Sequence, residues 1–131
     1  MIHHISIGVS DILASGAFYD AILSPLGYIR AFEDLRPGEQ HQAIGYGTKV
    51  DEDKFTIKER FATDLSPGPG FHLAFSAPTR EAVEEWHKRG KEMGGTNRGE
   101  PKLWAEFGPD YFAAYLTDPD GWQIEAVYKV V

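Results

Sequence analysis

The feature that most constrains this chain is an internal repeat. The stretch IHHISIGVSD at residues 2–11 resembles GFHLAFSAPT at residues 70–79, and the alignment places His4 on His72. A repeat of this kind determines the architecture of the whole chain. The same separation of 68 residues also brings three further pairs into register, namely Phe18 with Trp86, Ala14 with Ala82 and Gly27 with Gly95.

The repeat predicts one domain over residues 1–131 that is built from two copies of one unit. Unit one covers about residues 1–63, and unit two covers about residues 70–131. The segment between them, DLSPGP at residues 64–69, has the Pro, Gly and Ser content of a connection.

In each unit the residue pattern predicts a strand, a helix and three more strands. This βαβββ order belongs to the α+β class. In unit one the helix is expected over residues 11–26, with Ser10 or Asp11 as its cap and Gly27 at its end. In unit two it is expected from Thr79 to Met93, with an apolar, buried face made of Ala82, Val83, Trp86 and Met93. The later strands are expected at 28–34, 41–47 and 54–60, and at 96–104, 110–117 and 122–129.

Composition narrows the classes of partner. Hydrophobic residues make up 42% of the chain and charged residues 25%, which is typical of a globular protein. The net charge of −7 argues against nucleic acid or an anionic membrane as the main partner. There is no cysteine, no signal-peptide pattern and no apolar run long enough to span a membrane, so we expect a cytoplasmic protein with a small-molecule partner.

The first strand of each unit predicts a ligand-binding face. In unit one Ile5, Ile7 and Val9 alternate with His4 and smaller residues. In unit two Phe71, Leu73 and Phe75 alternate in the same way with His72 and smaller residues. The bulky apolar face must cover the helix that follows, so each histidine lies on the opposite, concave face, where a ligand would bind.

The sequence DPDGWQIEAV at residues 118–127 predicts a hairpin that places Glu125. Proline and glycine at these positions favour a three-residue loop over 119–121, which pairs Tyr115 with Glu125 on one face. A two-residue loop would reverse the faces of strand 110–117 but not those of strand 122–129. The predicted loop puts Glu125 on the concave, solvent-exposed face with Tyr111, Ala113, Tyr115, Gln123 and Val127, and the core face then holds Phe112, Ala114, Leu116, Ile124 and Ala126.

These segments together resemble the vicinal oxygen chelate superfamily, which includes glyoxalase I, extradiol dioxygenases, fosfomycin-resistance transferases and bleomycin-resistance proteins. The resemblance rests on HHISIGVSD, HLAF and DPDGWQIEAV in this order, and it covers nearly the whole chain. It implies that the two units form a curled mixed sheet, a half-barrel around a central cleft with the helices outside. It also implies a homodimer in many members, some of which build the site from units of two chains.

The same resemblance implies a divalent metal ion (Zn, Ni, Fe, Mn or Co) held by His4, His72 and Glu125. A fourth ligand of glyoxalase I would fall here on Ile57 by the constant separation, or on Lys58 if FTIKE is aligned with WQIEA. Neither side chain is a normal ligand for such a cation, and Glu59 would need a one-residue slip to reach the inner face. The chain therefore departs from glyoxalase I at this position.

Three functions are compatible with this pattern. The first is a glyoxalase-like metal-dependent lyase or isomerase acting on a small oxygen-chelating substrate, with Glu125 or Tyr115 as the catalytic group that moves a proton. The second is an Fe(II) ring-cleaving dioxygenase, for which His41 is the candidate for an additional acid–base histidine. The third is a bleomycin-resistance-like protein that binds a small molecule without chemistry.

Other residues have more modest expectations. The alternation places His3 opposite His4, in a structural role, and His87 follows Trp86 on a helix and is expected to be exposed. Trp104 and Phe107 fall in the segment 99–109, which is expected either to connect two strands or to cover the binding site.

Overall fold

The computed structural model describes residues 1–129, and both units have the predicted βαβββ order. In each unit the first strand pairs in parallel with the last, and the other pairs are antiparallel. The sheets have the orders β1-β4-β3-β2 and β5-β8-β7-β6. The elements are β1 (Ile5–Val9), α1 (Ile12–Leu23), β2 (Ile29–Asp34), β3 (Ala43–Gly47) and β4 (Phe55–Glu59), followed by β5 (Leu73–Ser76), α2 (Arg80–Glu92), β6 (Thr96–Leu103), β7 (Phe112–Thr117) and β8 (Gln123–Tyr128).

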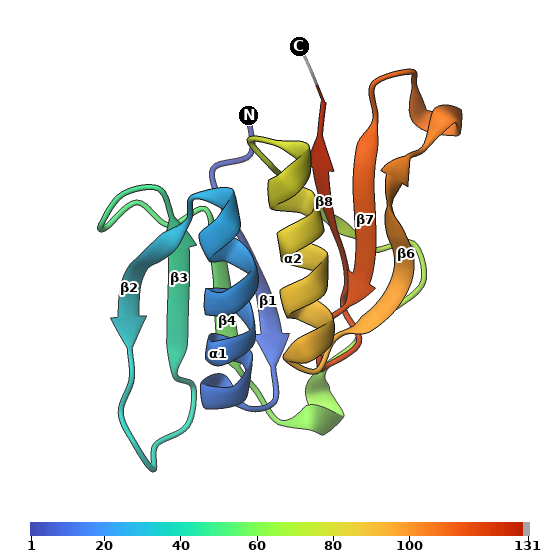
Figure 1. Ribbon diagram of the computed structural model, residues 1–131. Helices are drawn as coiled ribbons and strands as arrows, with labels where there is room; N and C mark the ends of the chain where they lie inside the picture. The colour runs from blue at the N-terminus through green and yellow to red at the C-terminus, as the bar shows by residue number, and fades with distance from the viewer. Residues whose placement is uncertain (130–131) are drawn as a thin grey trace.

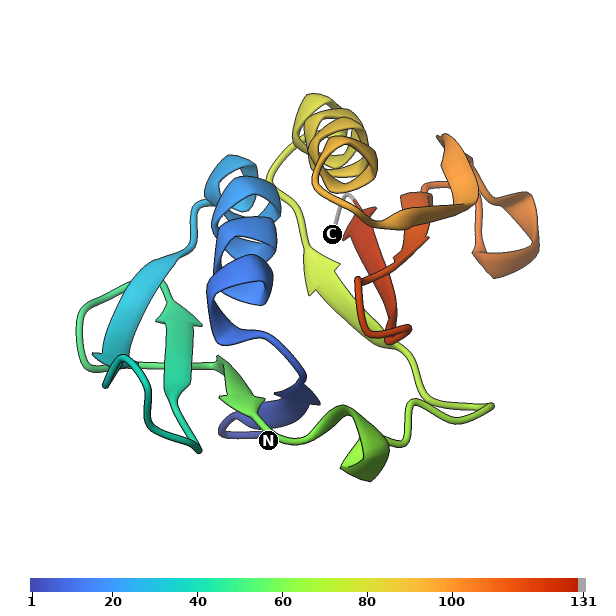
Figure 2. The same cartoon turned by 90° about the horizontal axis from the view of Figure 1, so that it is seen from below.

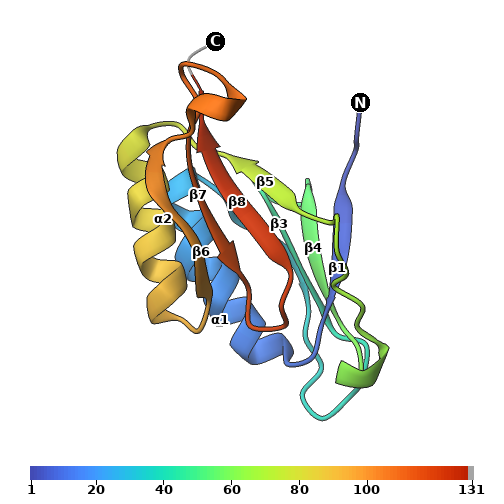
Figure 3. The same cartoon turned by 90° about the vertical axis from the view of Figure 1, so that its right-hand side faces the viewer.

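The two helices lie side by side and cover one side of both sheets (Figures 1 and 2). The two sheets remain separate four-stranded sheets and do not close into a barrel. Strands β1 and β5 each pair with a single neighbour, so each is an edge strand. The other face of each sheet points away from the helices, which agrees with the predicted α+β fold (Figure 3).

The helix of unit one is capped and ended by local chemistry. Asp11 accepts hydrogen bonds from the backbone N–H groups of Leu13 and Ala14, both at 3.1 Å. The α-helix stops at Leu23, and a single 3₁₀ turn over Ser24–Leu26 completes the predicted span. Pro25 in this turn has no N–H to continue the α-helical pattern, and Gly27 then takes the left-handed conformation that ends it.

Two predictions about the helix of unit two were wrong, and both concern which of its side chains are buried. Trp86 and Val83 are fully buried as expected, but Met93 is 42% exposed, because it sits at the C-cap beyond the last turn. His87 was expected to be exposed and is 2% exposed. Strand β6 packs against this side of α2, and the His87 Nε2 atom lies 2.9 Å from the Asn97 Oδ1 atom.

The turn between β7 and β8 has the predicted three-residue loop. The Asp118 N–H donates to the Trp122 carbonyl at 2.9 Å, and Gly121 has a φ of 94°. Tyr115 is therefore paired with Glu125, as predicted. All five residues assigned to the core face of this hairpin are buried, namely Phe112, Ala114, Leu116, Ile124 and Ala126.

The same turn ties unit two to unit one. The buried Asp118 carboxylate accepts a hydrogen bond from the Tyr19 hydroxyl of α1 at 2.6 Å. The Trp122 indole N–H donates to the Gly8 carbonyl at 2.7 Å. Burial raises the pKa of Asp118 to about 6, even though its hydrogen bonds act in the opposite direction. These contacts join the end of the second sheet to β1 and α1.

Candidate functional site

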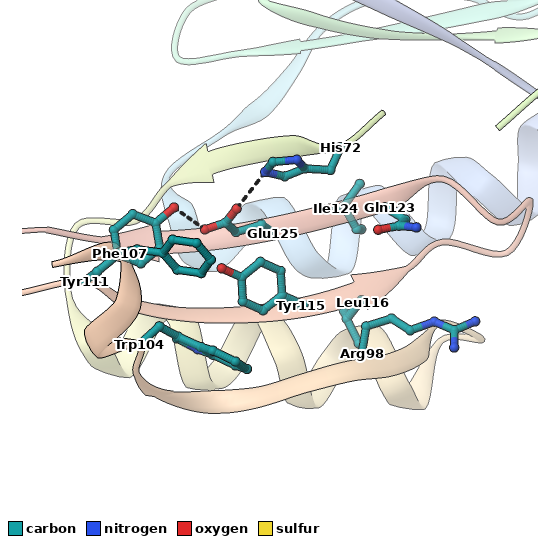
Figure 4. A pocket seen from close by; sticks show the side chains of 10 residues that line it. All are labelled: His72, Arg98, Trp104, Phe107, Tyr111, Tyr115, Leu116, Gln123, Ile124 and Glu125. Atoms are coloured by element: carbon teal, nitrogen blue, oxygen red, sulfur yellow. Dashed lines mark hydrogen bonds and ion pairs between the residues drawn. The ribbon is translucent and has the colours of Figure 1, made fainter. Parts of the chain in front are cut away.

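A pocket of about 440 Å³ lies on the open face of the second sheet (Figure 4). All of its lining residues belong to unit two, and they come from the segment before β5, from β6 to β8 and from the segment 104–111. The lining residues are His72, Arg98, Trp104, Phe107, Tyr111, Tyr115, Leu116, Gln123, Ile124 and Glu125.

Glu125 forms the floor of this pocket. It lies on the predicted face of β8, opposite Ile124 and Ala126, but it is only 1% exposed and not open to solvent as expected. The Tyr111 hydroxyl donates to one carboxylate oxygen at 2.5 Å, and His72 Nε2 lies 3.1 Å from the other. The aromatic side chains around the pocket therefore cover a group that the strand alone would leave exposed.

The charge of Glu125 has few partners in the chain. Within residues 1–129, no lysine or arginine forms an ion pair with Glu125, and its one basic neighbour is the His72 imidazole. The His72 side chain is 55% exposed and reaches the carboxylate from the mouth of the pocket. A buried carboxylate is costly unless a cation or several hydrogen bonds compensate for it.

Two tyrosines surround this carboxylate and remain protonated at neutral pH. Burial, and then the Glu125 charge, raises the pKa of Tyr115 to about 12. Burial, and then the hydrogen bond to Glu125, raises the pKa of Tyr111 as well. Both hydroxyls are therefore hydrogen-bond donors and poor bases.

Tyr111 lies on the face that was predicted for it, but its hydrogen bond to Glu125 was not predicted. Phe112, which pairs with Tyr128, is the first residue of β7 that pairs with β8. Tyr111 therefore lies one residue before the paired part of the strand, and its ring reaches back along the sheet to Glu125. Strand alternation predicts the face on which Tyr111 lies, but it does not predict how far the side chain extends along the sheet. The contact between Tyr111 and Glu125 could therefore not be predicted from the register alone.

His4 does not join this cluster within the chain. It precedes β1 just as His72 precedes β5, and its Nδ1 atom lies 2.9 Å from that of His3. Figure 3 shows the segment before β1 separated from β8. In the described part of the chain, no three His, Asp or Glu side chains lie close enough together to hold a metal ion. One chain thus assembles two of the three expected ligands.

The position equivalent to Glu125 in unit one is Thr56, which corrects the predicted Ile57 or Lys58. Ala74 pairs with Glu125, and its repeat counterpart Ser6 pairs with Thr56. The separations are 51 and 50 residues, so unit one is one residue shorter between these strands. The Thr56 hydroxyl donates to the Asp53 carboxylate at 2.6 Å.

His41, the candidate for an additional histidine, lies elsewhere. It lines a second pocket of about 200 Å³ together with Ser10, Glu59 and Arg60 of unit one. Trp104 and Phe107, by contrast, do line the Glu125 pocket. The segment 99–109 therefore contributes walls to the site, and they come from its part beyond the end of β6 at Leu103.

The donor atoms of His72 and Glu125 suit a divalent transition metal, since imidazole nitrogen and carboxylate oxygen are its usual ligands. Protein sites for such metals use at least three protein ligands. The pair in one chain is therefore an incomplete set that needs a further donor.

Comparison with known proteins agrees with this architecture. A crystal structure of a glyoxalase/bleomycin resistance protein from Albidiferax ferrireducens is 29% identical, with a TM-score of 0.75 over 96% of this chain and 97% of that one. The fosfomycin resistance protein FosX from Listeria monocytogenes shares the fold at 18% identity and a TM-score of 0.68, over 98% and 92% of the two chains.

A mutant of glyoxalase I from Zea mays also shares the fold, at 19% identity and a TM-score of 0.72. The alignment covers 95% of this chain and 45% of the maize chain. A comparison with curated protein sequences gave no match. Among the described residues, no helix is long and apolar enough to cross a membrane.

The sequence model of one family matches residues 1–126, which is nearly the whole chain. The resemblance that was found in the repeat, the histidines and the hairpin is thereby confirmed. The chain belongs to the Glyoxalase/Bleomycin resistance protein/Dioxygenase superfamily.

Proposed function

We propose that the protein is a glyoxalase-like metal-dependent lyase or isomerase that acts on a small, oxygen-chelating substrate. One observation supports this most directly: the Glu125 carboxylate is buried at the floor of a pocket, and within residues 1–129 its one basic neighbour is a histidine. A carboxylate and an imidazole in this position form the beginning of a metal site.

The metal would be held by His72 and Glu125 of one chain and by His4 of the partner subunit in a homodimer. The two edge strands, β1 and β5, support this arrangement because each lacks a hydrogen-bonded neighbour on one side. When bound, a divalent ion such as Zn, Ni, Fe, Mn or Co polarises the oxygens of a substrate.

The remaining groups handle the proton and exclude water. Glu125, once displaced from the metal, would be the candidate base, because it is a carboxylate on the pocket floor next to the space a substrate would occupy. Tyr111 fixes one of its oxygens through a hydrogen bond, which orients the other oxygen. Tyr115 stays protonated and acts as a donor to a substrate oxygen.

A binding protein without chemistry is the second candidate. The walls of Trp104, Phe107, Tyr111 and Tyr115 give an aromatic surface on which a flat ligand stacks. This candidate needs no metal and no second chain in the site. An Fe(II) dioxygenase has less support, because His41 lines a different pocket from Glu125.

The test has a binding arm and an activity arm. Metal-free protein is loaded separately with each of the five metals, and bound metal is measured by mass spectrometry after gel filtration. We expect Glu125→Gln and His72→Ala to lose the bound metal, and His41→Ala, a matched histidine in the other pocket, to keep it. Wild-type content unchanged in both site variants would contradict the proposed site.

In the activity arm, solvent proton exchange on hemithioacetals is followed by NMR with the metal-loaded protein. Exchange that depends on Glu125 supports the lyase or isomerase. Tight metal binding with no exchange, together with oxygen uptake on catechols, would instead support the dioxygenase. Binding of flat ligands with neither metal nor exchange would support the binding protein.

A further inference from the structure

The Glu125 pocket has a second polar end that the proposed chemistry does not use. Arg98 and Gln123 lie at one end of the pocket, whereas Glu125 and Tyr111 lie at the other (Figure 4). The ring of Tyr115 lies between the two ends, and the Trp104 ring lies beside the Glu125 end. The pocket is therefore polar at both ends and has an aromatic ring between them.

Arg98 differs from the other arginines in having no partner. Within residues 1–129, Arg30, Arg36 and Arg89 pair with carboxylates, Arg60 donates to a backbone carbonyl and Arg80 stacks on the Phe112 ring. Among the same described residues, Arg98 forms no ion pair, no side-chain hydrogen bond and no contact with an aromatic ring. This is notable in a chain with 20 acidic residues and a net charge of −7.

A bulge in β6 accounts for the place of Arg98. Asn97 pairs with Leu116 and Gly99 pairs with Tyr115, so residues 98 and 99 together oppose one residue of β7. A bulge of this kind re-aims side chains, and bulges are over-represented next to functional sites. Asn97 turns toward the helix and bonds to His87, while Arg98 lines the pocket.

Gly99, the other residue of the bulge, leaves room for the aromatic rings of the pocket. A Cβ atom at this position would lie 2.9 Å from atoms of both the Trp104 and Tyr115 rings. The Trp104 indole is fixed by a 2.8 Å hydrogen bond from its Nε1 to the Ala113 carbonyl, and it meets Tyr115 edge-on at 5.0 Å. The two rings thus meet in a defined arrangement before any ligand binds.

We infer that Arg98 binds a carboxylate of the substrate, and that the substrate carries a flat apolar body between this carboxylate and the oxygens presented to Glu125. This assignment rests on the proposed function for the reacting end of the pocket. Arg98 lies on β6 and Glu125 lies on β8, and only β7 separates these strands, so these two residues are about 10 Å apart at the backbone. That span fits an arylalkanoic acid.

A carboxylate suits this end better than a phosphate. The planar guanidinium matches a carboxylate with two parallel hydrogen bonds, and Gln123 supplies an amide donor beside it. A phosphate dianion would need more positive charge than one arginine supplies. Arg98 is the one lysine or arginine among the residues that line this pocket.

The test uses metal-free protein, dialysed against EDTA, so that it does not depend on the metal site. The probes are 3-phenylpropionate, its neutral amide 3-phenylpropionamide, and phenethyl phosphate. Binding is followed by the NMR signal of the Trp104 indole N–H, which is identified with Trp104→Phe. We expect the acid to bind about tenfold more tightly than the amide to the wild-type protein.

Arg98→Gln should abolish this preference for the acid and leave the affinity for the amide unchanged. Lys88→Gln, which removes the same charge from the exposed side of α2, should keep it. An unchanged acid-to-amide ratio in Arg98→Gln, or no binding of either probe to the wild-type protein, would overturn the inference. Tighter, Arg98-dependent binding of the phosphate would replace the carboxylate with a phosphate.

The two proposals fail separately in these experiments. Loss of the acid preference in Arg98→Gln upholds the carboxylate end even if Glu125→Gln proves to have no effect on bound metal. Conversely, a metal site that depends on Glu125 stands even if Arg98→Gln binds both probes as the wild-type protein does.

Discussion

The two units have the same strand order, but they differ at the position of the Glu125 carboxylate. In unit two this position is Glu125, which is buried at the floor of a pocket, and in unit one it is Thr56, which bonds to Asp53. Each unit also places one histidine just before its first strand. The difference shows that a duplicated fold keeps its topology while only one copy holds the carboxylate.

The open faces of the two sheets are also covered differently. On the open face of unit one, the side chain of Leu65 from the connecting segment sits over Gly8, where a Cβ atom would lie 2.6 Å from it. In unit two the rings of Trp104 and Tyr115 stand over Gly99 and line a cavity. Side chains thus fill the first face at Gly8, while the second face keeps space for a ligand.

The largest effect should come from giving unit one the residue of unit two. Thr56→Glu places a second carboxylate beside Asp53 at a site that is 2% exposed. We expect the free energy of unfolding to fall by about 3 kcal/mol, because a buried charge without a cation is costly. Urea unfolding measures this, and Thr56→Val, which keeps the shape, should cost less. Equal stability of Thr56→Glu and the wild-type protein would show that the two faces are equivalent after all.

The second prediction concerns the contact that joins the units. Asp118 has a folded pKa of about 6, which is above its ordinary value, so the folded protein binds this proton more tightly than the unfolded chain does. Its contribution to the unfolding free energy therefore increases, by about 2 to 3 kcal/mol, as the pH falls from neutral to about 4.

The measurement is urea unfolding of the wild-type protein and Asp118→Asn at both pH values. The stability of the variant relative to the wild-type protein should fall by that amount on acidification, because the asparagine does not titrate. A relative stability that is the same at both pH values would contradict the raised pKa and the burial that causes it.

The third prediction compares two glycines on equivalent open faces. In Gly45→Ala the new Cβ would lie 2.3 Å from the Phe32 ring and 2.8 Å from the Asp53 Cβ. We expect a loss of about 2 kcal/mol of stability by thermal or urea unfolding, since overpacking forces side chains out of their positions. A loss below about 0.5 kcal/mol would show that Phe32 moves freely and that this face is loosely packed.

Gly99→Ala should have the smallest effect on stability, about 1 kcal/mol, because the rings that it meets border a cavity into which they can shift. Its effect on the affinity of a flat ligand should be more evident than its effect on unfolding, and the titration of 3-phenylpropionamide measures it. If stability falls as much as in Gly45→Ala and affinity is unchanged, the rings are not walls of a binding site.

Much of the fold was readable from the sequence, because the relevant signals are local. The repeat gives the βαβββ order, and the DPDG turn gives the register that pairs Tyr115 with Glu125. What failed depended on packing between distant segments. His87 is buried because β6 packs against its helix. Glu125 is buried because the side chains of Tyr111 and its neighbours cover it.

The site was partly predictable for the same reason. Alternation identifies the face on which His72 and Glu125 meet, but it does not say how the two sheets stand relative to each other. The position of His4 depends on that relation. A one-residue difference in length between the units moved the equivalent of Glu125 to Thr56, and only the observed register reveals such a shift.

The most direct test of the central claim is metal binding by a mixture of two inactive variants. If the site joins His72 and Glu125 of one chain to His4 of the partner subunit, then His4→Ala and Glu125→Ala should each lose the metal as pure proteins. After they are unfolded together in equal amounts and refolded, half of the dimers are mixed, and each mixed dimer has one intact site. A site shared between two chains predicts recovery of about a quarter of the wild-type metal content. No recovery, with both pure variants depleted, would contradict a shared site.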